Sequence, residues 1–261
     1  MPAAAEAKAI RENGAIVVTI VYDNYPYDKR LRAAWGFACV VTGVEKTILF
    51  DTGGDGGILL ANMRTCGIKP DEIEAVVLSH VHADHTGGLD AFLQANSGVT
   101  VYLPKMFPER IKRQARKAGA VLVESEGPRK VCGGAWTTGV LNGGIPEQGL
   151  YLKGPHGLIV ITGCAHPGIV RMVHAATTHA GQKPRAVLGG FHMAGASPDQ
   201  IAAVIEGFKG LGVRRVAPCH CSGDETRRLM MQAFGQGYLP SGVGARLVFE
   251  PETGSSGNPP E

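Results

Sequence analysis

Short apolar runs, broken by small and polar residues, recur along the whole chain. Runs of roughly four to eight apolar residues between glycine or polar clusters are typical of buried strands, whereas longer stretches with apolar residues three or four positions apart are typical of helices. The pattern predicts strands at residues 15–22, 37–42, 47–51, 75–79, 99–103, 120–123, 130–138, 150–153, 158–162, 186–188, 214–217 and 245–249. It predicts helices at residues 58–66, 90–95, 169–178, 198–211 and 225–233, with a further basic helix within 105–117.

The order of these elements predicts an α/β fold in one domain. Hairpins dominate the first half, with residues 42–45 as a connecting turn, and strand and helix alternate in the second half. No Pro/Gly/Ser-rich linker separates the halves, so we expect a single domain over residues 1–250 and a frayed tail at 251–261. The expected architecture is a four-layer αββα sandwich, in which two mixed sheets pack together and helices cover both outer faces.

Composition and charge narrow the possible partners. With 44% hydrophobic and 19% charged residues, the 261-residue chain has the make-up of an ordinary globular protein. Its formal net charge is only +3, and its densest basic segment, residues 105–117, has no interleaved aromatic platform. We therefore interpret that segment as an amphipathic helix with a solvated basic side and expect a small-molecule substrate, not nucleic acid.

The location of the protein is predicted from what the sequence lacks. No apolar run approaches the roughly 20 residues that span a bilayer, and the first residues lack the apolar core of a signal peptide. The six cysteines do not have the spacing of a disulfide framework. These features favour a cytoplasmic protein with free thiols and no membrane partner.

Three histidines and one aspartate fall within six positions, directly after the apolar run at residues 75–78. Because alternate side chains of a strand share one side, His80 and His82 can converge on one metal ion. Asp84 and His85 lie in the turn behind them and can face a second ion. Imidazole and carboxylate are ligands that zinc, iron and manganese accept, so this cluster predicts a metal site.

Single histidines end three later apolar strands: His166, His192 and His220. Cys164 and Cys221 lie close to two of them, and thiolate would bind zinc well. Neighbouring side chains of an extended strand point in opposite directions, so we expect Cys221 to pack away from the metal. Free cysteine is most often a small buried apolar residue, and we expect the same of Cys164.

The segment 78–89, H-x-H-x-D-H followed by glycine, resembles the metal-binding signature of the metallo-β-lactamase superfamily. Residues 51–53, Asp-Thr-Gly, match the turn that precedes this signature, and His166 and His220 match the later single ligands. The resemblance implies the αββα fold and one or two divalent ions per chain, most often zinc, with iron or manganese as alternatives. It places one ion on His80, His82 and His166, and a second on Asp84, His85 and His220.

A narrower resemblance concerns one branch of that superfamily. Residues 21–24, 48–53, 162–168, 189–192 and 220–223 together look like the 7,8-dihydropterin-6-methyl-4-(β-D-ribofuranosyl)-aminobenzene-5′-phosphate synthases. That branch usually has Glu-His before the glycine of its second strand, where this chain has Ala34-Trp35-Gly36. The segment 24–27 with Trp35 could form an aromatic wall over the metals or could simply pack.

The resemblance implies a metal-dependent hydrolase, in which a metal-activated water attacks an ester, lactone, thioester or phosphoester. Asp84 would both ligate and act as a general base. Binuclear members usually carry a bridging aspartate between the fourth and the last histidine of the series. The acidic residue found there in this chain, Asp199, is interpreted as a residue of the first turn of a helix. His192 would then replace the bridging aspartate, as a ligand or as a proton donor. Asp51 would accept the other N–H of a ligand histidine. The alternatives are a dihydropterin-related transferase and a non-catalytic metal-binding sensor.

Overall fold

A computed structural model describes residues 14–154 and 156–250; the predicted tail at 251–261 lies outside the described residues. Thirteen strands of this part of the chain form two sheets. The first sheet has the order β13-β1-β2-β3-β4-β5-β6. Its strands are β1 (Ile16–Tyr22), β2 (Ala38–Thr42), β3 (Ile48–Phe50), β4 (Ala75–Val77), β5 (Thr100–Pro104), β6 (Val121–Ser125) and β13 (Arg246–Phe249).

The second sheet has the order β12-β11-β10-β9-β8-β7. Its strands are β7 (Lys130–Cys132), β8 (Ala135–Thr137), β9 (Leu150–Gly154), β10 (Gly157–Thr162), β11 (Pro184–Gly190) and β12 (Arg215–Cys219). Both sheets are mixed: β3 to β6 run parallel in the first, and β10 to β12 run parallel in the second. Strands of a parallel run end at the same edge of their sheet, so the loops that follow them come together there.

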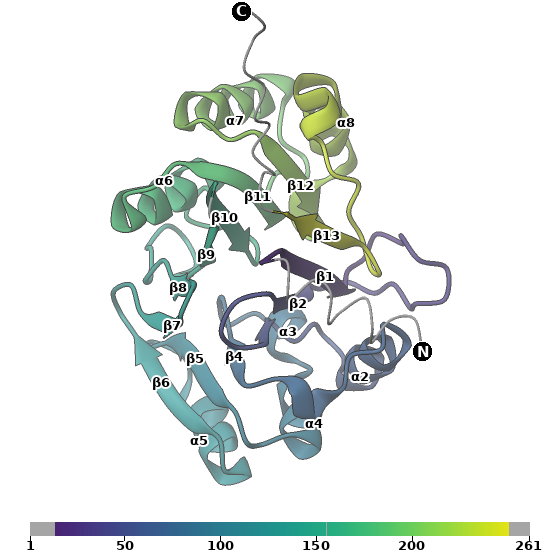
Figure 1. Ribbon diagram of the computed structural model, residues 1–261, viewed down its shortest axis with the longest axis vertical. Helices are drawn as coiled ribbons and strands as arrows, with labels where there is room; N and C mark the ends of the chain where they lie inside the picture. Colours follow the sequence, from purple (N-terminus) through teal and green to yellow (C-terminus); the bar gives the residue numbers. More distant parts are fainter. Residues whose placement is uncertain (1–13, 155, 251–261) are drawn as a thin grey trace, which may run out of the picture.

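Three apolar layers hold the sandwich together, and Figure 1 shows helices on both outer sides of the sheets. Between the sheets, Ile20 and Val77 of the first face pack in one cluster with Ile161 and Leu188 of the second. Helices α2 (Gly56–Thr65), α4 (Leu89–Ala95) and α5 (Glu109–Ala118) cover the other face of the first sheet. Helices α6 (Ile169–Ala180), α7 (Pro198–Leu211) and α8 (Asp224–Phe234) cover that of the second. The predicted αββα sandwich is confirmed.

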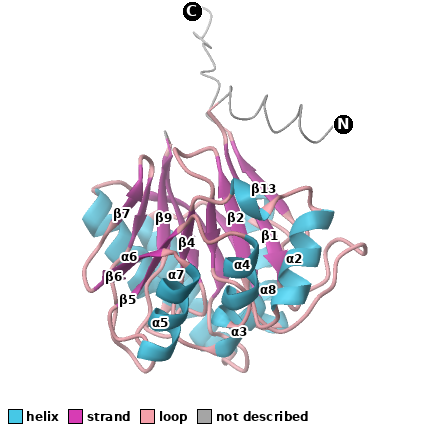
Figure 2. Ribbon diagram, turned by 90° about the horizontal axis from the view of Figure 1, so that it is seen from below, coloured by secondary structure: helices cyan, strands magenta, loops and turns pink. Residues whose placement is uncertain are grey.

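Two local predictions were wrong. Residues 130–138, predicted as one strand, form the hairpin of β7 and β8, because Gly133 and Gly134 turn the chain and Gly134 has a φ of 86°. The segment after β4, predicted as a turn, contains the short helix α3 (Ala83–Thr86). Figure 2 shows α3 beyond one end of the strands. The remaining short helical turns are η1 (Pro70–Glu72), η2 (His220–Ser222) and η3 (Gly235–Gly237).

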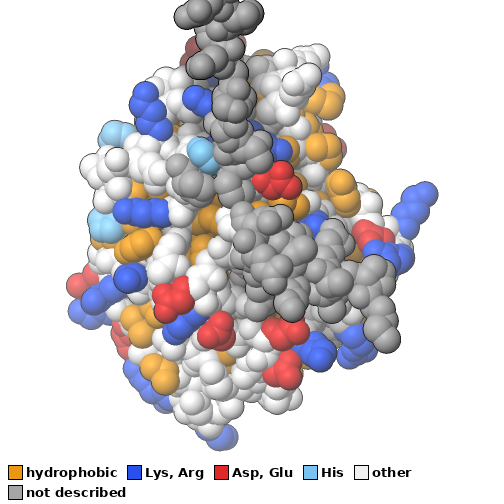
Figure 3. Space-filling model, viewed as in Figure 1, with side chains coloured by type: hydrophobic (Ala, Val, Ile, Leu, Met, Phe, Trp, Pro, Cys, Tyr) orange, Lys and Arg blue, Asp and Glu red, His pale blue; other side chains and the backbone are white. Residues whose placement is uncertain are grey.

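The surface carries mixed charge. Helix α5 is amphipathic, as predicted: Ile111 and Ala115 are buried, whereas Arg110 and Arg113 are exposed. On the face shown in Figure 3, both basic and acidic side chains appear, with uncharged surface between them. Among the described residues, no helix is long and apolar enough to cross a membrane.

Candidate metal centre

The candidate site lies where the parallel strands of both sheets end. Asp51 follows β3, the 79–85 segment follows β4, and His166, His192 and His220 follow β10, β11 and β12. All seven residues predicted as ligands therefore come from segments that directly follow a strand, where a rigid scaffold positions functional side chains.

The backbone at these strand ends is strained. Within residues 14–154 and 156–250, four residues other than glycine have a positive φ: Asp51 (56°), Ala165 (63°), His192 (52°) and His220 (49°). Such residues cost free energy in this conformation and cluster at functional sites, where the surrounding structure enforces them. Here each one follows a different strand and redirects its loop towards the same place.

His80, His82 and His166 form a first triad: one ligand atom from each lies within 4.8 Å of the other two. Nε2 of His80 is 3.2 Å from Nδ1 of His82. Nδ1 of His166 is engaged elsewhere, so its Nε2 is the atom free to bind. The structure therefore brings the three predicted ligands of the first ion close to one another.

Asp84, His85 and His220 form a second triad by the same measure. Nε2 of His85 is 3.2 Å from Nε2 of His220, and Oδ2 of Asp84 is 3.4 Å from the latter atom. The rings of His80 and His85 lie 4.2 Å apart, so the two triads are adjacent.

Buried oxygen atoms fix the orientation of these histidines. The Nδ1–H of His85 donates to Oδ2 of Asp51 at 2.8 Å, as predicted for this carboxyl. Ser79 donates its hydroxyl to the same oxygen at 2.7 Å and contacts Nδ1 of His80 at 2.8 Å. Nδ1 of His220 is 3.1 Å from Oδ1 of Asn24. Partners of this kind hold a ligand imidazole in one tautomer and one orientation.

Glu147 is the residue that the sequence did not reveal. Its buried carboxylate accepts N–H bonds from the backbone of Cys164, Ala165 and His166, and a fourth from Nδ1 of His166. Burial opposes its ionisation, but the hydrogen bond from His166, the nearby His80 and these backbone groups lower its pKa to about 2. Nothing in the 142–148 loop marks this glutamate, because its partners lie 17 to 19 residues further along the chain.

The protonation states suit a divalent cation. Burial, together with neighbouring histidines, lowers the pKa of both His80 and His85 to about 3, so each imidazole is neutral near pH 7. Burial opposes the ionisation of Asp84, but its hydrogen bond with His220 and the nearby His85 hold its pKa below the ordinary value. The neutral imidazoles of His80 and His85 and the ionised carboxylate of Asp84 are groups that zinc, iron or manganese accepts as ligands. The residues present therefore fit two ions.

The cysteines lie closer to the histidines than expected. Sγ of Cys164 is 3.2 Å from Nε2 of His85, and Cys164, His192 and Cys221 form a further group of possible ligands. Both cysteines are buried, as expected of free thiols, but the argument for the direction of Cys221 assumed an extended backbone that is not found here. Ala165 and His220 have positive φ, and residues 220–222 form a 3₁₀ turn, so side chains do not alternate there.

His192 lies beside the first triad, with its ring centroid 4.5 Å from that of His166. Among the described residues its ligand atoms group with the two thiols and not with either triad. Its hydrogen bond with Cys221 raises its pKa, which burial opposes. Asp199 lies in the first turn of α7 and is exposed, as predicted.

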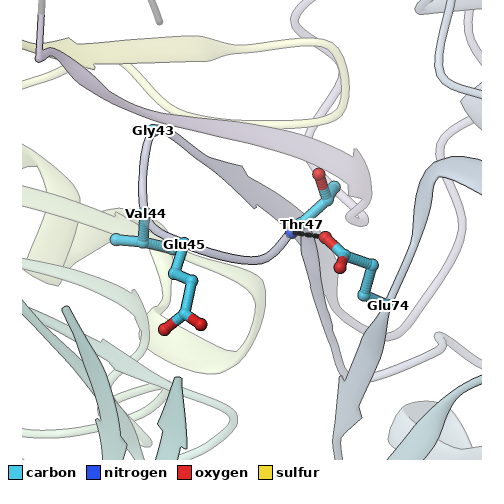
Figure 4. A pocket seen from close by; sticks show the side chains of 5 residues that line it. All are labelled: Gly43, Val44, Glu45, Thr47 and Glu74. Carbon is cyan, nitrogen blue, oxygen red and sulfur yellow. Dashed lines mark hydrogen bonds between the residues drawn. The ribbon is translucent and has the colours of Figure 1, made fainter. Parts of the chain in front are cut away.

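Two hollows of the surface differ in their position relative to this centre. One of about 350 Å³ is lined by His166, His192 and Arg171, so it opens beside the first triad. Another of about 240 Å³ lies at the start of β3, where Thr47 N–H donates to Glu74 (Figure 4). Because Asp51 follows the other end of β3, this second hollow is at the opposite end of the sheet from the histidines.

Comparison with known proteins identifies the family. The family model described as Metallo-beta-lactamase superfamily matches residues 36–184, more than half of the chain. The chain belongs to the metallo-beta-lactamase superfamily. The superfamily predicted from the histidine signature is thereby confirmed, and membership implies an enzyme that binds divalent metal.

The resemblance to the dihydropterin branch is also confirmed. A 7,8-dihydropterin-6-methyl-4-(beta-D-ribofuranosyl)-aminobenzene-5'-phosphate synthase of Methanocaldococcus jannaschii is 29% identical, over 89% of this chain and 96% of that protein. The structure of Tm1679, described as a metal-dependent hydrolase of the beta-lactamase superfamily, has a TM-score of 0.74 and 24% identity, covering 90% of this chain and all of that one. The structure of a diphosphatase from the PhnP family has a TM-score of 0.60 and 16% identity, and the match covers 90% of this chain and 98% of that one. At these identities the two solved structures show the fold alone.

Proposed function

We propose that the protein is a metal-dependent hydrolase that acts on an ester, lactone, thioester or phosphoester of a small molecule in the cytoplasm. The observation that carries the proposal is the pair of adjacent triads, His80/His82/His166 and Asp84/His85/His220. Zinc is the ion that this donor set fits best, with iron or manganese as alternatives. Bound divalent ions would polarise a substrate oxygen and make water a stronger nucleophile near neutral pH.

The chain's own residues supply the proton transfers. The ionised carboxylate of Asp84 is 22% exposed and faces Nε2 of both His85 and His220, so it can orient a water molecule and accept a proton. His192 is exposed beside His166, and its hydrogen bond with Cys221 raises its pKa. A protonated His192 can donate to the leaving group from the side of the 350 Å³ cavity.

A second candidate is a dihydropterin-related transferase. The relative that is 29% identical is named as a dihydropterin-related synthase. The position of Trp35 is a separate, physical reason to consider a substrate with a flat ring. The indole is 59% exposed, and its ring lies 4.9 Å from that of His220. An exposed aromatic face next to the second triad can stack on a planar ring. The ring of Tyr25, in contrast, is covered by the guanidinium of Arg227, 3.8 Å from its centroid, so of the two alternatives left open by the sequence Tyr25 packs against the protein.

The test is hydrolysis of a panel of carboxyl esters, thioesters, lactones and phosphoesters by protein reconstituted with zinc, manganese or iron. His82→Ala should abolish turnover on any substrate that is cleaved, and chelation should do so reversibly. His174→Ala, an exposed histidine of α6 that belongs to neither triad, is the matched control and should retain activity. Metal binding without cleavage of any panel member would contradict the hydrolase. Saturable pterin binding would then favour the transferase, and its absence a metal-binding sensor.

A further inference from the structure

The end of β11 is packed too closely against neighbouring loops to carry a side chain at Gly190. A Cβ at Gly190 would lie 2.3 Å from the carbonyl oxygen of Gly163 and 2.7 Å from Sγ of Cys221, so no side chain fits there. Phe191, the next residue, is buried in the cluster under α6 and α7. This strand therefore cannot place a carboxylate between the triads.

Cys164 lies at that position. Its Sγ is 3.2 Å from Nε2 of His85 in the second triad. The same sulfur also groups with His80 of the first triad: the ligand atoms of His80, His85 and Cys164 lie within 4.8 Å of one another. Among the described residues, this sulfur is thus the donor atom that joins a member of each triad. The thiol is 4% exposed, so solvent does not compete strongly for it.

The conformation of the loop after β10 directs the side chains of both Cys164 and His166 towards the triads. Glu147 binds the backbone N–H groups of residues 164, 165 and 166, and Ala165 between them has a φ of 63°. The reversal at Ala165 lets both flanking side chains reach the site. A positive φ at alanine costs free energy, which this fourfold anchoring offsets.

The nearby carboxyl groups have other partners. Asp51 receives hydrogen bonds from Ser79 and His85, and Glu147 receives four, as described above. Asp199 is exposed on α7. Apart from Asp84, which already belongs to the second triad, the described part of the chain offers no free carboxylate here. The remaining anionic donors are the thiols of Cys164 and Cys221, and of these two only Cys164 groups with a member of each triad.

We infer that Cys164 is a thiolate ligand shared by the two metal positions. The inference rests on the proposed binding of two ions to the triads. On binding, the S–H bond breaks, sulfur–metal bonds form and the proton passes to solvent, since thiolate is the ligand form. The sulfur of Cys221 contacts the carbonyl oxygen of Cys164 at 3.6 Å and groups with Cys164 and His192, but with no member of either triad, so it is not assigned as a ligand of the triads.

X-ray absorption at the zinc edge tests this in the full chain reconstituted with two zinc ions under reducing conditions. A shared sulfur gives each ion one zinc–sulfur bond of about 2.3 Å, so the average is about one sulfur per zinc. Cys164→Ala should show none, and Cys221→Ala, the matched control with a neighbouring thiol removed, should keep the full count. Cys164→Ser provides a second variant with a hydroxyl in place of the thiol, and circular dichroism checks that each variant is folded.

The outcomes separate this inference from the proposed metal centre. Failure of the wild-type protein to bind zinc would refute both. Two bound ions with nitrogen and oxygen neighbours alone would refute only the role of Cys164. An average near one half would place sulfur on one ion and overturn the shared position. Sulfur retained in Cys164→Ala, or lost in Cys221→Ala, would also overturn it.

Discussion

The carboxyl group of Asp51 lies 2.8 Å from Nδ1 of His85 and, through the hydroxyl of Ser79, is linked to Nδ1 of His80. One buried carboxyl therefore orients a histidine of each triad. Because neither histidine can turn without breaking this network, Asp51 determines which ring nitrogen of each is directed at the metal position.

Asp51→Asn should weaken binding of both ions by about 10- to 100-fold, the usual effect of losing such a partner. The amide NH2 would face the Nδ1–H of His85 or the donors of Ser79, which favours the wrong imidazole tautomer. Asparagine tolerates the φ of 56° at this position, so the backbone is not the cause of the loss. Competition with a chromophoric chelator gives the two dissociation constants.

Asp55→Asn is the control for that measurement. Asp55 caps α2 by accepting the N–H of Ile58, and asparagine caps a helix equally well. The variant makes the same change of charge four residues away and should bind both ions as the wild type does. Equal affinities in Asp51→Asn and Asp55→Asn would show that Asp51 does not orient the ligands.

The part of the site that could be predicted is the part encoded locally. His80, His82, Asp84 and His85 follow one strand within six positions, so strand geometry alone brings them together. The layers of the fold were predictable for a related reason: the nearly continuous apolar runs of β1 and β2 indicate strands that are buried on both faces.

What could not be predicted depends on contacts between distant segments. Glu147 and Asn24 are ordinary loop residues in the sequence, and only the folded chain brings Asn24 to His220, 196 positions away. The closeness of the Cys164 sulfur to His85 was not foreseen for the same reason. The positive φ of Ala165 and of His220 is imposed by hydrogen bonds from their backbone N–H groups to Glu147 and Asp23. No local sequence pattern indicates it.

Glu147→Gln should destabilise the metal-free protein by about 3 kcal/mol, as expected when one partner of a buried charged network is removed. Four N–H donors converge on the carboxylate, and the amide NH2 of glutamine would place a fifth donor among them. Urea unfolding at pH 7 measures the difference. Glu206→Gln, which alters an exposed pair with Lys209, should change stability by less than about 0.5 kcal/mol.

The pH dependence of that difference follows from the depressed pKa of Glu147. The pKa is about 2 in the folded protein against an ordinary value of 4.5, so the ionised carboxylate contributes its full stability above about pH 4.5. The contribution declines as the pH falls from 4.5 and is lost near pH 2. Comparison of wild type with Glu147→Gln at several pH values isolates this group, since other titrating residues are common to both proteins. A difference that stayed constant from pH 5 to pH 3 would contradict the role assigned to Glu147.

Trp35→Ala should raise KM for a substrate with a planar ring by about fivefold, which corresponds to about 1 kcal/mol of lost stacking, and should leave kcat nearly unchanged. The reason is its position: the indole is 59% exposed and 4.9 Å from the ring of His220, so it can contact the substrate without binding metal. Tyr27→Ala removes another exposed aromatic side chain of the same loop region and serves as the control, with KM unchanged. Steady-state kinetics on paired aromatic and aliphatic substrates separates stacking from general damage, because only the aromatic member should lose affinity. An equal rise in KM for both members would mean that Trp35 shapes the entrance and does not stack on the substrate.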